Sequence, residues 1–431
     1  MDFVEIAILV LSFLTLIALG TPITVSLALS SFFTLGVNVV FIASTTTIAQ
    51  RMINGLDSFT LLAIPFFILA GQIMNSGGIA LRLIEFAKAI VGPFRGGLLF
   101  VNILACTLFG AISGSAAAAA SAVGSILSDK MEKEGYDKAF TTAANVTSAT
   151  TGLLIPPSNV LIMYSLAAGG LSIGALFIAG YLPGLLMSIA LMIASYFYAV
   201  KKGYPKGNPY SISILTKTFL RAFPCLLLLV VVMGGIVAGI FTATEAAAIA
   251  VLYTFILALF YRELSFSKLK SILIDSSVTT AIVLLLVATS SSLSWVMSYG
   301  NLPQAISETL LALSNNPIVI LIMINLVLLA VGVFMDITPA ILIFTPIFLP
   351  VVESIGIDAT HFGIIMILNL CIGLCTPPVG NLLFVGASVA GISFQKVLKP
   401  MLPLYIVMLF VLLLVTIFPQ ISLWLPSLFG F

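Results

Sequence analysis

Residues 375–381 read CTPPVGN inside a long apolar segment, where two consecutive prolines are expected to break a helix. Proline removes a backbone donor, and its ring clashes with the preceding turn. Residues 154–160 repeat the arrangement as LIPPSNV, 221 positions earlier (Pro156 against Pro377). In hydrocarbon, irregular backbone persists only where protein or water satisfies its polar groups. The two breaks therefore predict two discontinuous helices whose irregular centres lie inside the protein or beside water.

The composition indicates an all-α protein that crosses a membrane several times. Of 431 residues, 61% are hydrophobic and 7% are charged, whereas soluble proteins carry about 25% charged residues. The net charge of +2 gives no reason to expect a nucleic-acid partner. The chain has four cysteines, all in apolar segments, and one histidine. Packing therefore explains the cysteines better than metal binding does.

A membrane-spanning helix needs about 20 apolar residues. By this measure we expect spans near residues 3–20, 22–43, 58–76, 138–168, 172–200, 221–240, 242–261, 277–298, 359–390 and 400–420.

Two further apolar regions, 95–133 and 317–355, are expected to form re-entrant helical hairpins. The first is interrupted by SGS at 113–115 and the second by MDITP at 335–339. Each half has about 15–18 residues, which is short for a full span. The tips of both hairpins are therefore expected to reach the interior of the bilayer.

The two halves of the chain match at a constant spacing of 221 residues. The predicted crossings of the first half are odd in number, so the second half begins on the opposite face and runs upside down. We predict two inverted repeats, 1–201 and 221–431, joined by a cytoplasmic connector at 202–220. The discontinuous helices are 138–168 and 359–390, and such matched interruptions point to the binding site of a secondary transporter. The matched pairs include Thr21 with Thr242, Gly135 with Gly356, Asp137 with Asp358, Gly152 with Gly373, Pro157 with Pro378, and Gly170 with Gly391.

The distribution of lysine and arginine predicts the orientation, because these residues are enriched in cytoplasmic loops. With the N-terminus outside, 16 of the 17 basic residues are cytoplasmic, and Arg51 alone is external. Both termini are then external, which is periplasmic in a Gram-negative cell. The cytoplasmic set is Arg82, Lys88, Arg95, Lys130, Lys133, Lys138, Lys201, Lys202, Lys206, Lys217, Arg221, Arg262, Lys268, Lys270, Lys396 and Lys399.

The breaks and the hairpin tips together predict two Na⁺ sites and a substrate site between them. Free carbonyls at the end of a half-helix suit Na⁺, and amides at a helix start suit anions. No lysine or arginine falls in a core span, so a bound carboxylate would rely on helix starts, hydroxyls, amides and Na⁺. The first Na⁺ site is predicted from Ser113, Gly114, Ser115, Gly152, Pro156, Ser158 and Asn159. The second is predicted from Gly332, Asp336, Thr338, Gly373, Thr376, Val379 and Asn381. The substrate is predicted to contact Ser113, Asn159, Thr338 and Asn381.

Each of these features also has a purely structural interpretation. The Pro-Pro pairs could only kink their helices, and SGSAAAAA at 113–120 could only permit close helix packing. Asp336 could belong to the second Na⁺ site or merely cap the second helix of its hairpin. Glu245 fits a capping box with Thr242, in which the glutamate satisfies the start of a helix. Residues 79–92 and 302–314 are amphipathic and are expected to lie along the two membrane interfaces as arms, although they could also be ordinary connecting helices.

Several stretches resemble the large membrane subunit of tripartite ATP-independent periplasmic (TRAP) transporters. They are LLAIPFFILAGQIMNSGG, GAISGSAAA, TTGLLIPPSN, TATEAAAIA and MDITPAILIFTPIFLP, and the likeness extends over nearly the whole chain. The resemblance implies an elevator-type fold like that of the ion-transporter superfamily, in the bacterial inner membrane. It implies Na⁺-driven import of an organic acid anion, with two or more Na⁺ ions as coupling ions.

The resemblance also implies partners. They are a small four-helix membrane subunit, a periplasmic substrate-binding protein and membrane lipid. The chain is too short to include a fused small subunit, so we expect that subunit to be a separate polypeptide. Known substrates of the family include C4-dicarboxylates and sialic acid (N-acetylneuraminate), and the general pattern is similar to the sialic acid branch.

Three other functions share some of these sequence features. An intramembrane hydrolase is disfavoured because GAISG lacks the spacing of a serine protease motif and Asp336 has no second acid at depth. An uncoupled channel would show no Na⁺ dependence. A stand-alone ion-coupled carboxylate transporter differs from the TRAP function only in needing no binding protein.

The predicted orientation can be measured with a reporter fused after Phe431. An external C-terminus makes an alkaline phosphatase fusion active and a fluorescent protein fusion dark. A fluorescent, phosphatase-negative fusion would overturn both the orientation and the inverted repeat.

Overall fold

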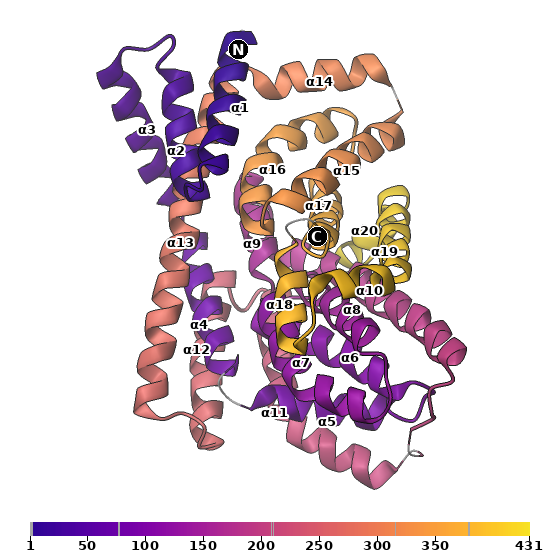
Figure 1. The fold of residues 1–431 in the computed structure, drawn as a ribbon. Helices are drawn as coiled ribbons and strands as arrows, with labels where there is room; N and C mark the ends of the chain where they lie inside the picture. Colours follow the sequence, from indigo (N-terminus) through magenta and orange to yellow (C-terminus); the bar gives the residue numbers. More distant parts are fainter. Residues whose placement is uncertain (1–2, 76–77, 208, 210, 315, 378–379) are drawn as a thin grey trace.

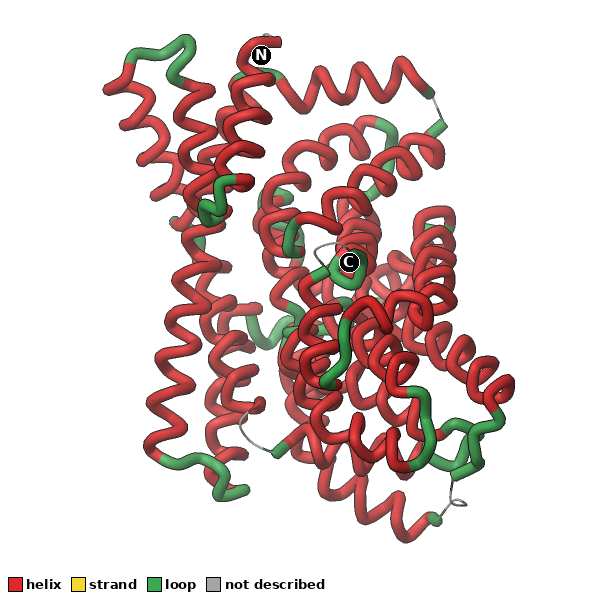
Figure 2. The backbone as a smooth tube through the Cα atoms, in the orientation of Figure 1, coloured by secondary structure: helices red, strands yellow, loops and turns green. Residues whose placement is uncertain are grey.

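The computed structural model describes residues 3–75, 78–207, 209, 211–314, 316–377 and 380–431. The described chain is built from helices, which confirms the all-α prediction (Figure 2). Seven of these helices are long and apolar enough to cross a membrane, or up to eight if one bent pair forms a single span.

One body of the protein is organised around α13 (Phe266–Tyr299), a helix of 34 residues. Figure 1 shows α13 upright, with α2 (Ile23–Leu35) and α3 (Phe41–Leu56) beside one half and α4 (Ala63–Asn75) beside the other. The body is completed by α1 (Phe3–Ala18), η1 (Phe59–Leu62), α11 (Ile212–Val237) and α12 (Ala243–Phe260). We call this body the scaffold.

Two scaffold segments differ from the predicted spans. The predicted span 22–43 ends earlier, as α2 at Leu35, and the separate helix α3 follows. The helix α3 carries three threonines, Gln50 and Arg51 in 16 residues. These polar residues lower the hydropathy of the segment, so the sequence did not predict a membrane helix there. The helix segments Phe41–Leu56 and Phe59–Asn75 meet at a 64° bend, which is compatible with a broken span or with a re-entrant loop. The last part of the predicted connector 202–220 is also helical, since α11 begins at Ile212.

The second body contains the two hairpins. The first is α6 (Gly97–Ser113) followed by α7 (Ala116–Lys133), and the second is α15 (Pro317–Phe334) followed by α16 (Ile337–Ser354). The helices α7 and α16 begin 221 residues apart and also end 221 residues apart (116 and 337, 133 and 354). The helix boundaries therefore follow the spacing seen in the sequence, while the inverted orientation of the halves stays a prediction.

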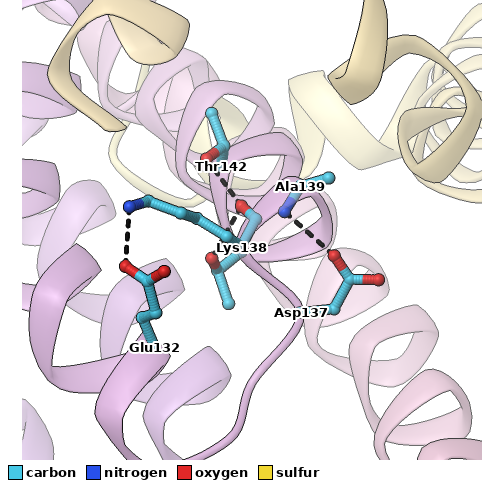
Figure 3. A network of polar contacts seen from close by, with 6 residues as sticks. Glu132, Asp137, Lys138, Ala139 and Thr142 are labelled. Carbon is cyan, nitrogen blue, oxygen red and sulfur yellow. Dashed lines mark hydrogen bonds and ion pairs between the residues drawn. The ribbon is translucent and has the colours of Figure 1, made fainter. Parts of the chain in front are cut away.

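The discontinuous helices lie between the hairpins. The first consists of α8 (Lys138–Ala149), η2 (Thr150–Leu153) and α9 (Asn159–Ala167), and the second of α17 (Ala359–Gly373) and α18 (Asn381–Ala390). Each starts at an aspartate whose carboxylate accepts hydrogen bonds from the first turn. Figure 3 shows this for Asp137, which accepts from the Ala139 amide at 2.9 Å beside an ion pair between Lys138 and Glu132. The remaining helices of the body are α10 (Ile173–Lys202), α19 (Phe394–Ile417) and α20 (Gln420–Leu428).

The predicted arms are helices in the structure. They are α5 (Ile79–Val91) and α14 (Leu302–Leu313), and each follows a scaffold helix and precedes a hairpin. In Figure 1 they lie across the direction of α13, at opposite ends of the molecule. The arms thus connect the scaffold to the hairpin body on both sides.

Glycine contacts hold each hairpin against its broken helix. A Cβ atom on Gly373 would lie 2.5 Å from the Cα of Gly332, and one on Gly152 would lie 2.4 Å from the Cα of Gly110. Real Cβ atoms do not approach backbone so closely, so only glycine allows these two pairs of helices to touch. Both contacts lie just before a break.

This packing predicts a large cost for one methyl group. Gly373→Ala should destabilise the protein by about 1–3 kcal/mol, since the backbone of α15 must shift. Gly234→Ala is the matched control, because its Cβ would meet nothing within 4 Å near the C-terminal end of α11. That variant should be neutral or stabilising by about 0.5–1 kcal/mol. Thermal unfolding in detergent measures both, and equal midpoints for the two variants would contradict the packing argument.

Candidate functional site

A cavity of about 360 Å³ lies where the two hairpin tips meet the two broken helices. The predicted substrate contacts Ser113, Asn159, Thr338 and Asn381 all lie in its wall. They come from four different segments, so the fold converges on one point. We call this space the central cavity.

The tip of the first hairpin presses against the first break. Gly114 has a left-handed backbone (φ +63°), and a Cβ there would lie 3.2 Å from Asn159 Nδ2. Ser115 caps α7 by accepting a hydrogen bond from the Ala118 amide at 3.3 Å. The Ser113 hydroxyl donates to the Ser115 carbonyl at 3.4 Å. The start of α7 is therefore held beside the break.

The predicted residues of the first Na⁺ site fall into two groups. Ser113, Gly114, Ser115 and Asn159 line the central cavity. Gly152, Pro156 and Ser158 are buried and are not part of its wall. Gly152 packs on Gly110, and the Ser158 hydroxyl donates to the Leu153 carbonyl, one of the carbonyls that the break frees.

The second tip carries a carboxylate into the central cavity. One Asp336 oxygen caps α16 by accepting from the Thr338 amide at 3.4 Å. The other accepts from the Asn381 side-chain amide at 3.4 Å. The capping interpretation of Asp336 is thus satisfied, while its second oxygen links the tip to the start of α18.

The predicted second Na⁺ site divides in the same way as the first. Asp336, Thr338 and Asn381 line the cavity. Gly332 and Gly373 pack on each other, and the Thr376 hydroxyl donates to the Ile372 carbonyl at 2.8 Å. Val379, like Pro378, lies outside the described residues.

The electrostatics of the central cavity are set by one acid. Asp336 is the only charged residue among the described residues that line the cavity. Asn159 Oδ1 is buried and accepts no hydrogen bond in the described structure. An anion placed here would meet a carboxylate and an unsatisfied oxygen, and no basic side chain of the described wall.

The scaffold supplies part of the wall, which the sequence did not predict. Gln72 and Asn75 of α4 and Thr279 of α13 line the cavity. A Cβ on Gly71 would lie 2.6 Å from the Ser113 carbonyl oxygen, so the scaffold touches the first tip directly. One feature of the sequence could have predicted this part of the wall. Two polar residues, Gln72 and Asn75, are spaced three apart at the end of an apolar span, which places them on one helix face.

The four cysteines are free and buried. Among the described residues, no group of three or more histidine, cysteine or acidic side chains could hold a metal ion. Cys371 and Cys375 instead contact the carbonyls of Thr150 and Val146, at 3.7 and 3.8 Å. Their place is in the contact between the two discontinuous helices.

The comparison with protein families identifies the chain. The profile described as "Tripartite ATP-independent periplasmic transporter, DctM component" matches residues 10–421. The chain belongs to this family. It is therefore the large permease component of a TRAP transporter, a multi-pass protein of the inner membrane and not an enzyme. Permeases of this family work with a substrate-binding protein and a small membrane subunit.

The TRAP relatives are similar over almost their full length. The uncharacterised protein YgiK of Salmonella typhimurium is 55% identical, with 97% of this chain and 96% of YgiK covered. The sialic acid TRAP transporter large permease SiaM of Vibrio cholerae is 42% identical, with 88% and 89% covered. The C4-dicarboxylate TRAP transporter large permease DctM of Pseudomonas aeruginosa is 41% identical, with 90% and 91% covered.

A solved structure has the same general fold. The YdaH transporter of Alcanivorax borkumensis superposes with a TM-score of 0.64 at 12% sequence identity, with 86% of this chain and 87% of YdaH covered. This likeness supports the fold class and says nothing of substrate.

Proposed function

We propose that this TRAP permease couples Na⁺ entry to the import of an organic acid anion, by an elevator movement of the hairpin body against the scaffold. The observation that carries the proposal is the charge of the central cavity. Its described wall holds one carboxylate, Asp336, and no lysine or arginine.

An anionic substrate in this cavity needs positive charge from elsewhere. Two unit charges about 6 Å apart repel by about 3 kcal/mol at an effective dielectric constant of 20. The starts of α7, α9, α16 and α18 offset part of this, at about 0.3–1 kcal/mol each. Bound Na⁺ supplies the rest, which makes anion binding depend on Na⁺ and couples the two.

The candidate Na⁺ ligands follow from the described oxygens. For the first site we propose Asn159 Oδ1, which has no other partner, together with the backbone of the tip at 113–115. For the second site we propose the Asp336 carboxylate together with the side-chain oxygen of Asn381, whose side-chain nitrogen already donates to that carboxylate. The freed carbonyls of Leu153 and Cys375 already accept from the hydroxyls of Ser158 and Tyr405. Each carbonyl keeps a second lone pair, so both functions are compatible.

The elevator movement is supported by the division of the molecule into two bodies. The hairpins and broken helices pack closely on one another, while α5 and α14 connect them to the scaffold at opposite ends (Figure 1). The scaffold touches the first tip through Gly71, which has no side chain to interlock with the tip. Such a surface allows sliding.

The relatives support an organic acid anion as cargo. SiaM is named for sialic acid and DctM for C4-dicarboxylates, and both substrates are carboxylates. Their identities of 42% and 41% do not favour one branch. Both are called large permeases and are covered almost fully by this chain, which supports a separate small membrane subunit as partner.

The proposed function predicts uptake that needs both partners and Na⁺. The chain is reconstituted into proteoliposomes with its small subunit, and loaded binding protein is added outside under an inward Na⁺ gradient. N-acetylneuraminate and succinate serve as first probes of the two substrate classes. We expect uptake of one class, lost without Na⁺ or without the binding protein. Robust uptake by the chain alone would favour a stand-alone carboxylate transporter instead.

Asp336→Asn separates the ionic role of this residue from its capping role. Asparagine and aspartate cap helices about equally well, so Asp336→Asn should fold normally. It should raise the Na⁺ concentration for half-maximal uptake about tenfold or more, because it removes a charge about 4 Å from the ion. Asp358→Asn is the control, since Asp358 caps α17 and does not line the cavity. An unchanged Na⁺ dependence in Asp336→Asn would mean that the carboxylate only caps the helix.

A further inference from the structure

A second cavity, of about 550 Å³, lies next to the central one between the scaffold and the hairpin body. We call it the outer vestibule, because it is lined by Arg51, the one basic residue that the charge distribution predicts to be external. Three helices line both cavities on successive turns. Each helix contributes one residue to the central cavity and another, about one turn further along, to the vestibule. These residue pairs are Met163 and Leu166 in α9, Val283 and Val287 in α13, and Thr338 and Leu342 in α16.

The scaffold side of the vestibule is polar. Ser290, Ser291, Ser294 and Ser298 of α13 line it, at spacings that put them on one helix face. Ser290 is 3% exposed, and its buried hydroxyl has no hydrogen-bond partner in the described structure. The packing of α3 against α13 alone does not account for this hydroxyl, which a ligand in the vestibule would satisfy.

Arg51 of α3 places a positive charge at this wall. Its guanidinium carbon lies 4.7 Å from the centre of the Trp295 ring. No salt bridge to Arg51 is found among the described residues, and no acidic residue is among those that line the vestibule. Stacking on an aromatic ring orients a guanidinium and leaves its edge donors available to an oxyanion. Asn54, one helical turn further along α3, adds a side-chain amide.

We propose that the outer vestibule is an anion-capture subsite, where Arg51, Asn54 and the serine face of α13 hold the carboxylate of the incoming substrate before it reaches the central cavity. The vestibule carries a positive charge and no described acid, whereas the central cavity carries an acid and no described base. Capture in the vestibule therefore needs no Na⁺, and binding in the central cavity does. A cavity whose wall carries charge of one sign also raises the local concentration of ligands of the opposite charge. The identity of the anion as cargo rests on the proposed function.

The test measures the charge preference of the vestibule directly. Ser294→Cys places a thiol in its wall, and the four native cysteines are buried and give little background. The purified complex in detergent is reacted with a negatively charged (sulfonatoethyl) and a positively charged (trimethylammonioethyl) methanethiosulfonate. Adding Arg51→Gln should change each rate about threefold in opposite directions, for a charge about 6 Å away in a water-filled vestibule with the dielectric constant of bulk water, about 80. The ratio of anionic to cationic rates should then fall about tenfold, and Arg51→Lys should largely preserve it.

A control thiol and an uptake measurement complete the test. Ser267→Cys is exposed at the other end of α13, so Arg51→Gln should leave its rate ratio unchanged. In proteoliposomes, Arg51→Gln should raise the concentration of loaded binding protein at half-maximal uptake, with unchanged Na⁺ dependence. If Arg51 is only an interfacial anchor stacked on Trp295, the rate ratio of the vestibule thiol will not respond to Arg51→Gln, and the proposal is overturned. The labelling needs no transport, so its outcome is independent of whether wild-type uptake proves to be driven by Na⁺.

Discussion

Every unpaired backbone group at the depth of the bilayer needs a partner, and this requirement governs the architecture of the permease. Two helices are broken within the apolar interior, and hydroxyl groups cover part of the break. Ser158 donates to the Leu153 carbonyl, and Tyr405 donates to the Cys375 carbonyl. A hairpin tip closes over each break as well, and Gly110, Gly152, Gly332 and Gly373 allow the backbones to touch. A close-packed hairpin thus offsets the free-energy cost of the unpaired backbone groups at each break. The same packing brings the helix starts to one cavity.

Under the proposed function, the same arrangement lets this cavity hold an anion without a basic side chain. Asp336, which adds negative charge, serves as both a helix cap and a link to Asn381. A salt bridge from lysine or arginine would bind a carboxylate whether or not Na⁺ was present. A site made of helix starts and one acid instead leaves the deficit of positive charge for the ion to fill. Under the proposed function, the absence of a basic residue from the described wall is what makes coupling obligatory.

The hairpins, the breaks and the four converging side chains could be predicted because each leaves a local signal. Pro-Pro pairs, the short apolar halves of the hairpins and the constant spacing between the repeats can be recognised in the sequence without knowledge of contacts between distant residues. The helix α3 was missed because its threonines and Arg51 lower its hydropathy. Of these residues, Arg51 lines the polar vestibule. Gln72 and Thr279 were missed for another reason, since they reach the cavity only through the packing of scaffold on hairpin body. Gly152 and Gly373 are packing contacts in the structure, and their role as Na⁺ ligands through backbone carbonyls stays a prediction.

The positions of the two cavities along α13 give the direction in which the hairpin body would move under the proposed elevator mechanism. In the described state the tips face Thr279 and Val283 of α13, and the serine face of the same helix begins at Ser290, about two turns further on. Moving the hairpin body along α13 from Val283 to Ser294 is a translation of about 16 Å at 1.5 Å per residue. It would carry the substrate site away from the Gln72 side of the scaffold toward Arg51. The scaffold would then present its positive charge to the substrate in the outward position and withdraw it in the inward one. Release inside would then be favoured by that loss of positive charge as well as by loss of Na⁺. Under the proposed mechanism, the scaffold would therefore take part in the transport cycle and not only support the moving body.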